Sequence, residues 1–81
     1  MMKVQIDTHI SKKKQICEVS IIINDFAIHE IKVLNGKKGI YLKFPSQTYP
    51  IKEQTRIKFY SAIIEKLKTN KEFIKYYEGK I

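Results

Sequence analysis

A chain of 81 residues is short enough to form one domain, and a hydrophobic content of 43% with five Tyr and four Phe excludes a disordered polypeptide. Sixteen Lys and Arg against eight Asp and Glu give a net charge of +8, which favours polyanionic partners, nucleic acid first. The single cysteine, Cys17, excludes a disulfide framework and fits a cytoplasmic compartment. No apolar run exceeds three residues, so the sequence predicts neither a membrane span nor a signal peptide.

Four segments alternate apolar and polar residues with the period of two that is typical of strands with one buried face. They are residues 4–10, 16–23, 26–34 and 40–44. A basic hairpin tip, an Asn-Asp turn and a turn with two glycines available for positive φ separate them in that order. The pattern predicts a four-stranded antiparallel meander.

The apolar period becomes helical from about Lys52 to Lys68. We expect the stripe of this helix to cover one face of the sheet; it consists of Ile57, Phe59, Tyr60, Ile63, Ile64 and Leu67. Residues 69–72 have capping-box spacing and predict a second, short helix with Phe73, Ile74 and Tyr77. The expected fold is α+β, a single domain over residues 1–81 in which residues 70–81 form a C-terminal helical extension.

The residues suited to catalysis or metal binding are few. Cys17 shares its strand face with Val19 and Ile21, which predicts a buried, inert thiol. His9 and His29 have no Cys, Asp or Glu at metal-ligand spacing, and His29 is expected as a hydrogen-bonded histidine in the core or at an interface. With a single arginine, the chain is poorly equipped to cleave RNA. We expect no enzyme, metal, cofactor or small-molecule substrate.

The stretch from Ile28 to Ser46, IHEIKVLNGKKGIYLKFPS, resembles the signature of the SpoVG family, stage V sporulation protein G or septation protein. A strand with a histidine leads through a G-x-x-G turn into an apolar strand closed by Pro-Ser. Residues 50–56 look like the family's entry into its helix, and the resemblance covers about residues 3–69. It implies a homodimeric cytoplasmic protein, with a helix across a curled antiparallel sheet, that binds DNA and RNA and influences septation and gene expression.

The chain departs from that pattern in two places. The first strand lacks the family's arginines, and the loop between Ser46 and the helix is shorter and uncharged. We expect dimerisation on physical grounds as well, because a small chain gains buried area by pairing and its strand edges need cover.

The candidate nucleic-acid-binding residues are all basic: Lys12, Lys13, Lys14, Lys37, Lys38, Arg56, Lys58 and Lys66. The three lysines of the hairpin tip are the first choice for phosphate contacts, and the outer face of the helix around Arg56 is the competing location. Tyr41, beside Lys43 on the outer face of its strand, is the best candidate for stacking on an unpaired base, and a dimer contact is an equal alternative. The alternative to nucleic-acid binding is that these lysines only form a solvated, lysine-rich surface.

A second class of function stays open at this point. The chain would then be a homo-oligomeric protein-interaction module in cell division, whose positive charge serves solubility.

Overall fold

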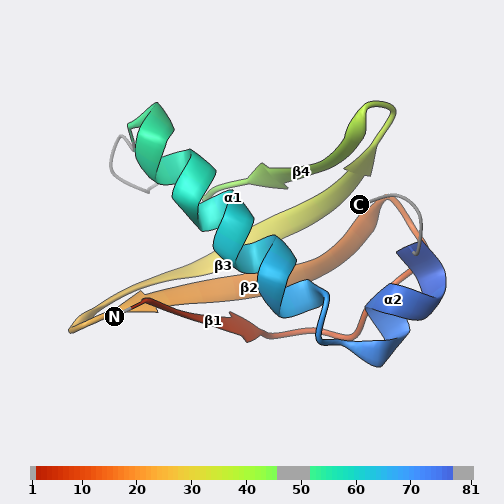
Figure 1. Cartoon of the computed structure of the whole chain (residues 1–81), viewed down its shortest axis with the longest axis horizontal. Coiled ribbons are helices and arrows are strands. Elements are labelled where there is room, and N and C mark those ends of the chain that lie inside the picture. Colours follow the sequence, from red (N-terminus) through yellow and green to blue (C-terminus); the bar gives the residue numbers. More distant parts are fainter. Residues whose placement is uncertain (1, 46–51, 78–81) are drawn as a thin grey trace.

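The computed structural model describes residues 2–45 and 52–77 of the chain. Its elements in chain order are β1 (Met2–Ile6), β2 (Gln15–Ile23), β3 (Phe26–Gly36), β4 (Gly39–Lys43), α1 (Glu53–Leu67) and α2 (Lys71–Tyr77). The strands form one antiparallel sheet in the order β1-β2-β3-β4, with α1 across one face (Figure 1). The predicted α+β meander with one long and one short helix is confirmed.

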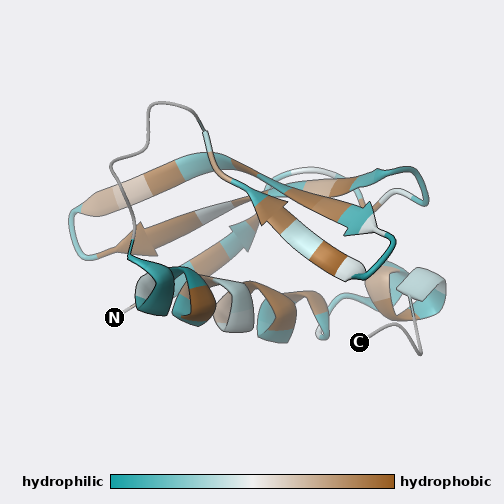
Figure 2. Cartoon of the chain, turned by 90° about the horizontal axis from the view of Figure 1, so that it is seen from above, coloured by the Kyte–Doolittle hydropathy of each residue, from teal (hydrophilic) through white to brown (hydrophobic). Residues whose placement is uncertain are grey.

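The two faces of the sheet differ in their cover. Both helices lie on the same side of the sheet, and no other described element covers the opposite side, which we call the outer face (Figure 2). None of the helices in the described part of the chain is long and apolar enough to cross a membrane.

The first strand is shorter than predicted, because it ends at Ile6 and not at residue 10. Beyond it, the backbone N–H of Asp7 still donates to the carbonyl oxygen of Glu18 at 2.8 Å. The N–H of Glu18, however, donates to the side-chain oxygen of Thr8 at 2.9 Å, so a side chain replaces the next strand partner. Residues 7–14 therefore form a loop and not a tight hairpin tip.

Two register shifts interrupt the pairing of β2 with β3. Val19 pairs with Ile31 and Ile21 with Ile28, so β3 carries one extra residue between these pairs. Glu30 lies in this bulge with φ of 60°. The strict alternation predicted for residues 26–34 is therefore wrong: Ile28 and Ile31 both face the core, although they are three residues apart.

The helix bounds were predicted to within a residue at each end, but its apolar stripe was predicted too broadly. Phe59, Ile63, Ile64 and Leu67 are buried, whereas Ile57 is 58% and Tyr60 37% exposed. The physical reason is the crossing direction: α1 runs diagonally from beside β4 toward β1, so only its C-terminal half lies over the middle of the sheet (Figure 1).

Asn70 caps α2, and the predicted capping box at residues 69–72 is wrong. The Asn70 side-chain oxygen accepts the backbone N–H of Phe73 at 3.1 Å, while the Thr69 hydroxyl donates to the Lys66 carbonyl oxygen. Phe73 and Tyr77 are buried, and the Tyr77 hydroxyl donates to the carbonyl oxygen of Ser11. The short helix is thereby attached to the β1–β2 loop.

Candidate nucleic-acid interface

The three lysines expected to contact phosphates lie exposed in the β1–β2 loop. The loop is held at its base, because the N–H of Ser11 donates to the carbonyl oxygen of Ile16 at 2.8 Å. Within it, the N–H of Lys13 donates to the Ser11 side-chain oxygen at 3.0 Å. These bonds present Lys12, Lys13 and Lys14 on a defined backbone.

The same loop contacts the end of β3. The carbonyl oxygen of Lys14 accepts the N–H of Asn35 at 2.7 Å, and Gln15 pairs with Leu34. Lys37 and Lys38 follow two and three residues after Asn35, in the exposed turn between β3 and β4. Five of the eight predicted site residues therefore gather at one end of the sheet, called here the basic end: Lys12, Lys13, Lys14, Lys37 and Lys38.

Lys12 has a specific neighbour in α2. Its amine nitrogen lies 4.7 Å from the centroid of the half-buried Tyr76 ring, within cation–π range. The α2 attachment through Tyr77 and Ser11 positions this ring. Sequence reasoning missed the contact, because nothing local relates residue 12 to residue 76.

The three predicted residues on α1 do not join the basic end. Arg56 lies in the first turns of the helix, with its guanidinium carbon 5.9 Å from the centroid of Phe44, just after β4. Lys66 is in the last turn, about 15 Å further along the axis at the usual helical rise, and Lys58 is exposed between them. Arg56, Lys58 and Lys66 are thus strung along the helix and do not cluster.

The tyrosines differ in how far their rings are exposed to solvent and so to a nucleic-acid base. Tyr77 is 3% exposed, and the half-buried Tyr76 lies under Lys12. Tyr60, expected in the core, is partly exposed and bonded through its hydroxyl to the carbonyl oxygen of Ile40. Tyr41 is 43% exposed, and Tyr49 lies outside the described residues.

A buried hydroxyl on β2 links the start of the β1–β2 loop to β3. The Ser20 hydroxyl, 2% exposed, donates to the Asp7 carboxylate at 2.5 Å and lies 2.9 Å from Nδ1 of His29. The predicted hydrogen bond of His29 is confirmed, but the residue is exposed and not in the core, because the bulge at Glu30 shifts the strand pattern. The trio ties strands together, and the burial of Ser20 keeps its oxygen from acting as a nucleophile.

Cys17 is buried, at 2% exposure, as predicted. Burial, reinforced by the negative charges of Asp7 and Glu18, raises the pKa of its thiol to about 11. The thiol is therefore protonated at neutral pH and unsuited to nucleophilic attack. In the described part of the chain, no three His, Cys, Asp or Glu side chains lie where they could share a metal ion.

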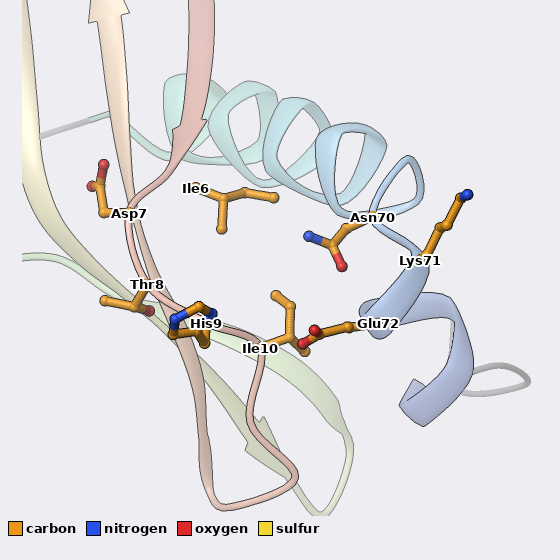
Figure 3. A pocket seen from close by; sticks show the side chains of 8 residues that line it. All are labelled: Ile6, Asp7, Thr8, His9, Ile10, Asn70, Lys71 and Glu72. Carbon is orange, nitrogen blue, oxygen red and sulfur yellow. The ribbon is translucent and has the colours of Figure 1, made fainter.

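A hollow of about 510 Å³ lies between the start of the β1–β2 loop and α2. Ile6, Ile10 and Asn70 reach toward it, while Lys71 points away (Figure 3). The Glu72 carboxylate is turned toward the hollow, whereas the Asp7 carboxylate is turned away and accepts the Ser20 hydroxyl (Figure 3). The one lysine among the residues that line it points away, so the hollow does not extend the basic end.

Comparison with curated proteins finds relatives that share one name. The chain is 38% identical over 65 residues to the "Putative septation protein SpoVG" of Agathobacter rectalis, a match that covers 67% of this chain and 75% of that protein. The protein of that name from Lachnoclostridium phytofermentans is 39% identical over 59 residues, covering 59% of this chain and 63% of the relative. For Clostridium acetobutylicum the identity is 36% over 62 residues, covering 60% and 65%. No family model matches the chain. No solved structure matches it either.

Proposed function

Because the chain belongs to the SpoVG family, we propose that it is a non-enzymatic DNA- and RNA-binding regulator that affects septation and gene expression. The binding is made mainly by lysines that contact phosphates. The protein acts as a cytoplasmic homodimer, without a cofactor or a small-molecule substrate.

The observation that carries this proposal is the basic end. The hydrogen bond between Lys14 and Asn35 joins two lysine clusters that are more than twenty residues apart in sequence. Five exposed lysines on two adjoining loops make a concentrated positive charge, to which a nucleic-acid backbone is attracted whatever its sequence. The chemistry of that attraction needs no catalytic group.

A titration with labelled duplex DNA, single-stranded DNA and RNA at several salt concentrations tests the proposal. Binding should weaken steeply as salt rises, because phosphate contacts release counterions. The Lys12→Gln/Lys13→Gln/Lys14→Gln triple variant should weaken duplex binding similarly for all sequences. It should also reduce the slope of log affinity against log salt by about 0.9 for each phosphate that is no longer neutralised. Thermal stability should change little, because exposed lysines contribute little to folding.

Two further variants locate the interface. Lys37→Gln/Lys38→Gln removes two charges from the basic end, and Lys58→Gln/Lys66→Gln removes two charges from α1. The first pair should reduce the salt slope more than the second. The opposite order would move the interface to α1, and an absence of binding by the unmodified protein would refute the proposed function.

The alternative, a homo-oligomeric protein-interaction module in cell division, is favoured by one observation. Met2 pairs with Ile23, which pairs with Phe26, so three apolar residues lie in a row across the sheet. Met2 is 37% and Phe26 52% exposed. Such a row suits contact with a second copy.

Sedimentation equilibrium with Phe26→Ser and the unmodified protein tests this contact. The unmodified protein should be a dimer, and the variant should dissociate at higher concentration. A monomer at tens of micromolar would refute the dimer. Partner capture that survives nuclease treatment, together with undetectable binding to nucleic acid, would favour the interaction module.

A further inference from the structure

Lys32 on β3 and Lys43 on β4 are direct partners across the outer face of the sheet. Both are exposed, and neither forms an ion pair with any of the described residues. Like charges opposite one another destabilise an antiparallel pair. Two acidic residues accompany them: Glu18 is the β2 partner of Lys32, and Glu30 lines a surface hollow together with both lysines. The fold thus places two cations directly opposite one another on its outer face.

This hollow has a volume of about 300 Å³, and Phe44 and Pro45, just after β4, also line it. Lys32 and Lys43 therefore border a concave site. An anionic group seated there would lie near both charges and relieve their mutual repulsion.

Tyr41 lies two residues before Lys43 on the same strand and face, about 7 Å away by the usual strand rise. Its ring lies against the backbone of Gly36: a Cβ at residue 36 would come within 2.8 Å of Cε1 and 2.9 Å of Cδ1. Gly36, unlike Gly39 at φ 124°, does not have a positive φ. The glycine at position 36 thus provides room for the ring, a role different from the one predicted for it.

Because one side of the ring lies against the backbone while 43% of the residue is exposed, Tyr41 is an aromatic surface held in position before any ligand arrives. An ordered ring loses less conformational freedom on binding than a mobile one. Lys37 and Lys38 of the basic end directly precede β4, so positive charge continues onto this part of the outer face.

We propose that a single-stranded segment of RNA or DNA binds along β4 on the outer face, with an unpaired base stacked on Tyr41 and the backbone phosphates beside Lys43 and Lys32. This site rests on the proposed function and makes it more specific. A duplex keeps its bases stacked within the helix, so only an unpaired base can offer its face to the tyrosine. Duplex DNA instead binds through phosphate contacts at the basic end.

Fluorescence anisotropy with one labelled sequence, as single-stranded RNA, single-stranded DNA and duplex DNA, tests the site. Tyr41→Ala should weaken single-strand binding by about five-fold or more, since base–aromatic stacking contributes on the order of a five-fold to hundred-fold gain. Duplex binding should change by less than about two-fold by the same reasoning. Tyr41→Phe, which keeps the ring, should restore single-strand binding.

Two variants test the glycine under the Tyr41 ring and the lysines beside it. Gly36→Ala keeps the tyrosine at residue 41, but the added methyl group displaces its ring from the backbone of residue 36. Like Tyr41→Ala, this variant should therefore weaken single-strand binding. Lys32→Gln/Lys43→Gln should lower the single-strand salt slope by about 0.7 for each phosphate that is no longer neutralised, with the duplex slope unchanged. The Lys12→Gln/Lys13→Gln/Lys14→Gln variant should instead lower the duplex slope. Circular dichroism of each variant checks that it is folded.

The outcomes separate this site from the function on which it rests. If the unmodified protein binds no nucleic acid, the proposed function fails and this site with it. If it binds, but Tyr41→Ala binds single strands equally well, the site is wrong and the proposed function stands. A Tyr41→Ala variant that becomes monomeric with unchanged affinity would show an interface between two copies and overturn the site. A weakening confined to RNA or to DNA would assign the site to that polymer.

Discussion

The hydroxyl of Tyr60 on α1 donates a hydrogen bond to the backbone carbonyl oxygen of Ile40 on β4, at 3.0 Å. Ile40 lies on an edge strand, where backbone groups without partners could pair with another chain. The bond therefore does two things: it occupies one polar group of the edge, and it ties the exposed N-terminal half of α1 to the sheet. This explains why an apolar stripe position carries a tyrosine that is 37% exposed.

Replacing Tyr60 by Phe should lower the free energy of unfolding by about 0.5–1.5 kcal/mol, the usual net contribution of one hydrogen bond. Urea denaturation measures the change. Tyr41→Phe is the matched control, because it removes a hydroxyl from an exposed ring, and it should leave the midpoint almost unchanged. Equal midpoints for Tyr60→Phe and the unmodified protein would contradict the role given to this bond.

Asn70→Ala should destabilise the protein by about 0.5–2 kcal/mol, because the first turn of α2 loses the side-chain oxygen that accepts the Phe73 N–H. Thermal unfolding measures the destabilisation. Asn70→Asp keeps a capping oxygen and should stay close to the unmodified protein. If Asp and Ala substitutions were equally harmful, the side chain would not be acting as a cap.

Ser20→Ala should cost about 0.5–1.5 kcal/mol of stability, the usual net contribution of a hydrogen bond, since the substitution removes the hydroxyl that Asp7 and His29 share. Chemical denaturation provides the measurement. Ser61→Ala, on an exposed position of α1, is a control of the same chemistry and should be close to neutral. Similar effects of the two substitutions would show that the buried trio adds no stability.

The Cys17 thiol should react slowly with a thiol reagent in the folded state and rapidly after unfolding. Two properties cause this protection: the side chain is 2% exposed, and its raised pKa of about 11 keeps the reactive thiolate scarce at pH 8. Absorbance of the released reagent follows the reaction with and without denaturant. Rapid labelling of the folded protein would place the thiol at the surface.

The same pKa predicts a loss of stability at alkaline pH. The folded state holds the thiol proton up to about pH 11, whereas the unfolded chain releases it above its ordinary value of 9.0. The unfolded state therefore binds fewer protons between these values, and the free energy of unfolding falls as the pH rises through them, by at most about 2–3 kcal/mol.

Cys17→Ala isolates this contribution. The variant loses packing at every pH, but its stability should fall less steeply between pH 9 and 11 than that of the unmodified protein. Parallel curves for the two proteins would mean that Cys17 does not titrate differently in the folded and unfolded states.

Local sequence patterns were sufficient to predict the strands and helices of this fold. The period of two predicted all four strands, and the helical period placed α1 to within a residue at either end. Both periods follow from where successive side chains point along a regular backbone, a property that needs no knowledge of the neighbouring elements. The burial of Cys17 followed from the same alternation.

What the sequence could not determine depends on pairing between distant segments. The bulge at Glu30 exists because β3 carries one residue more than β2 over that stretch, and it is this bulge that turns His29 out of the core. Likewise, only the register of β2 on β3 brings Lys14 to Asn35 and so unites the two lysine clusters.

The contact of the Tyr41 ring with Gly36 also depends on strand pairing: the two positions are five apart in the sequence, and the β3–β4 register brings the ring onto the glycine. The direction in which α1 crosses the sheet likewise decides that Ile57 and Tyr60 remain exposed. The sequence by itself determined which segments are strands and helices, because side-chain periodicity is local. The tertiary structure alone decided which charges and rings share a surface, because strand register and helix crossing are set by contacts between segments far apart in the chain.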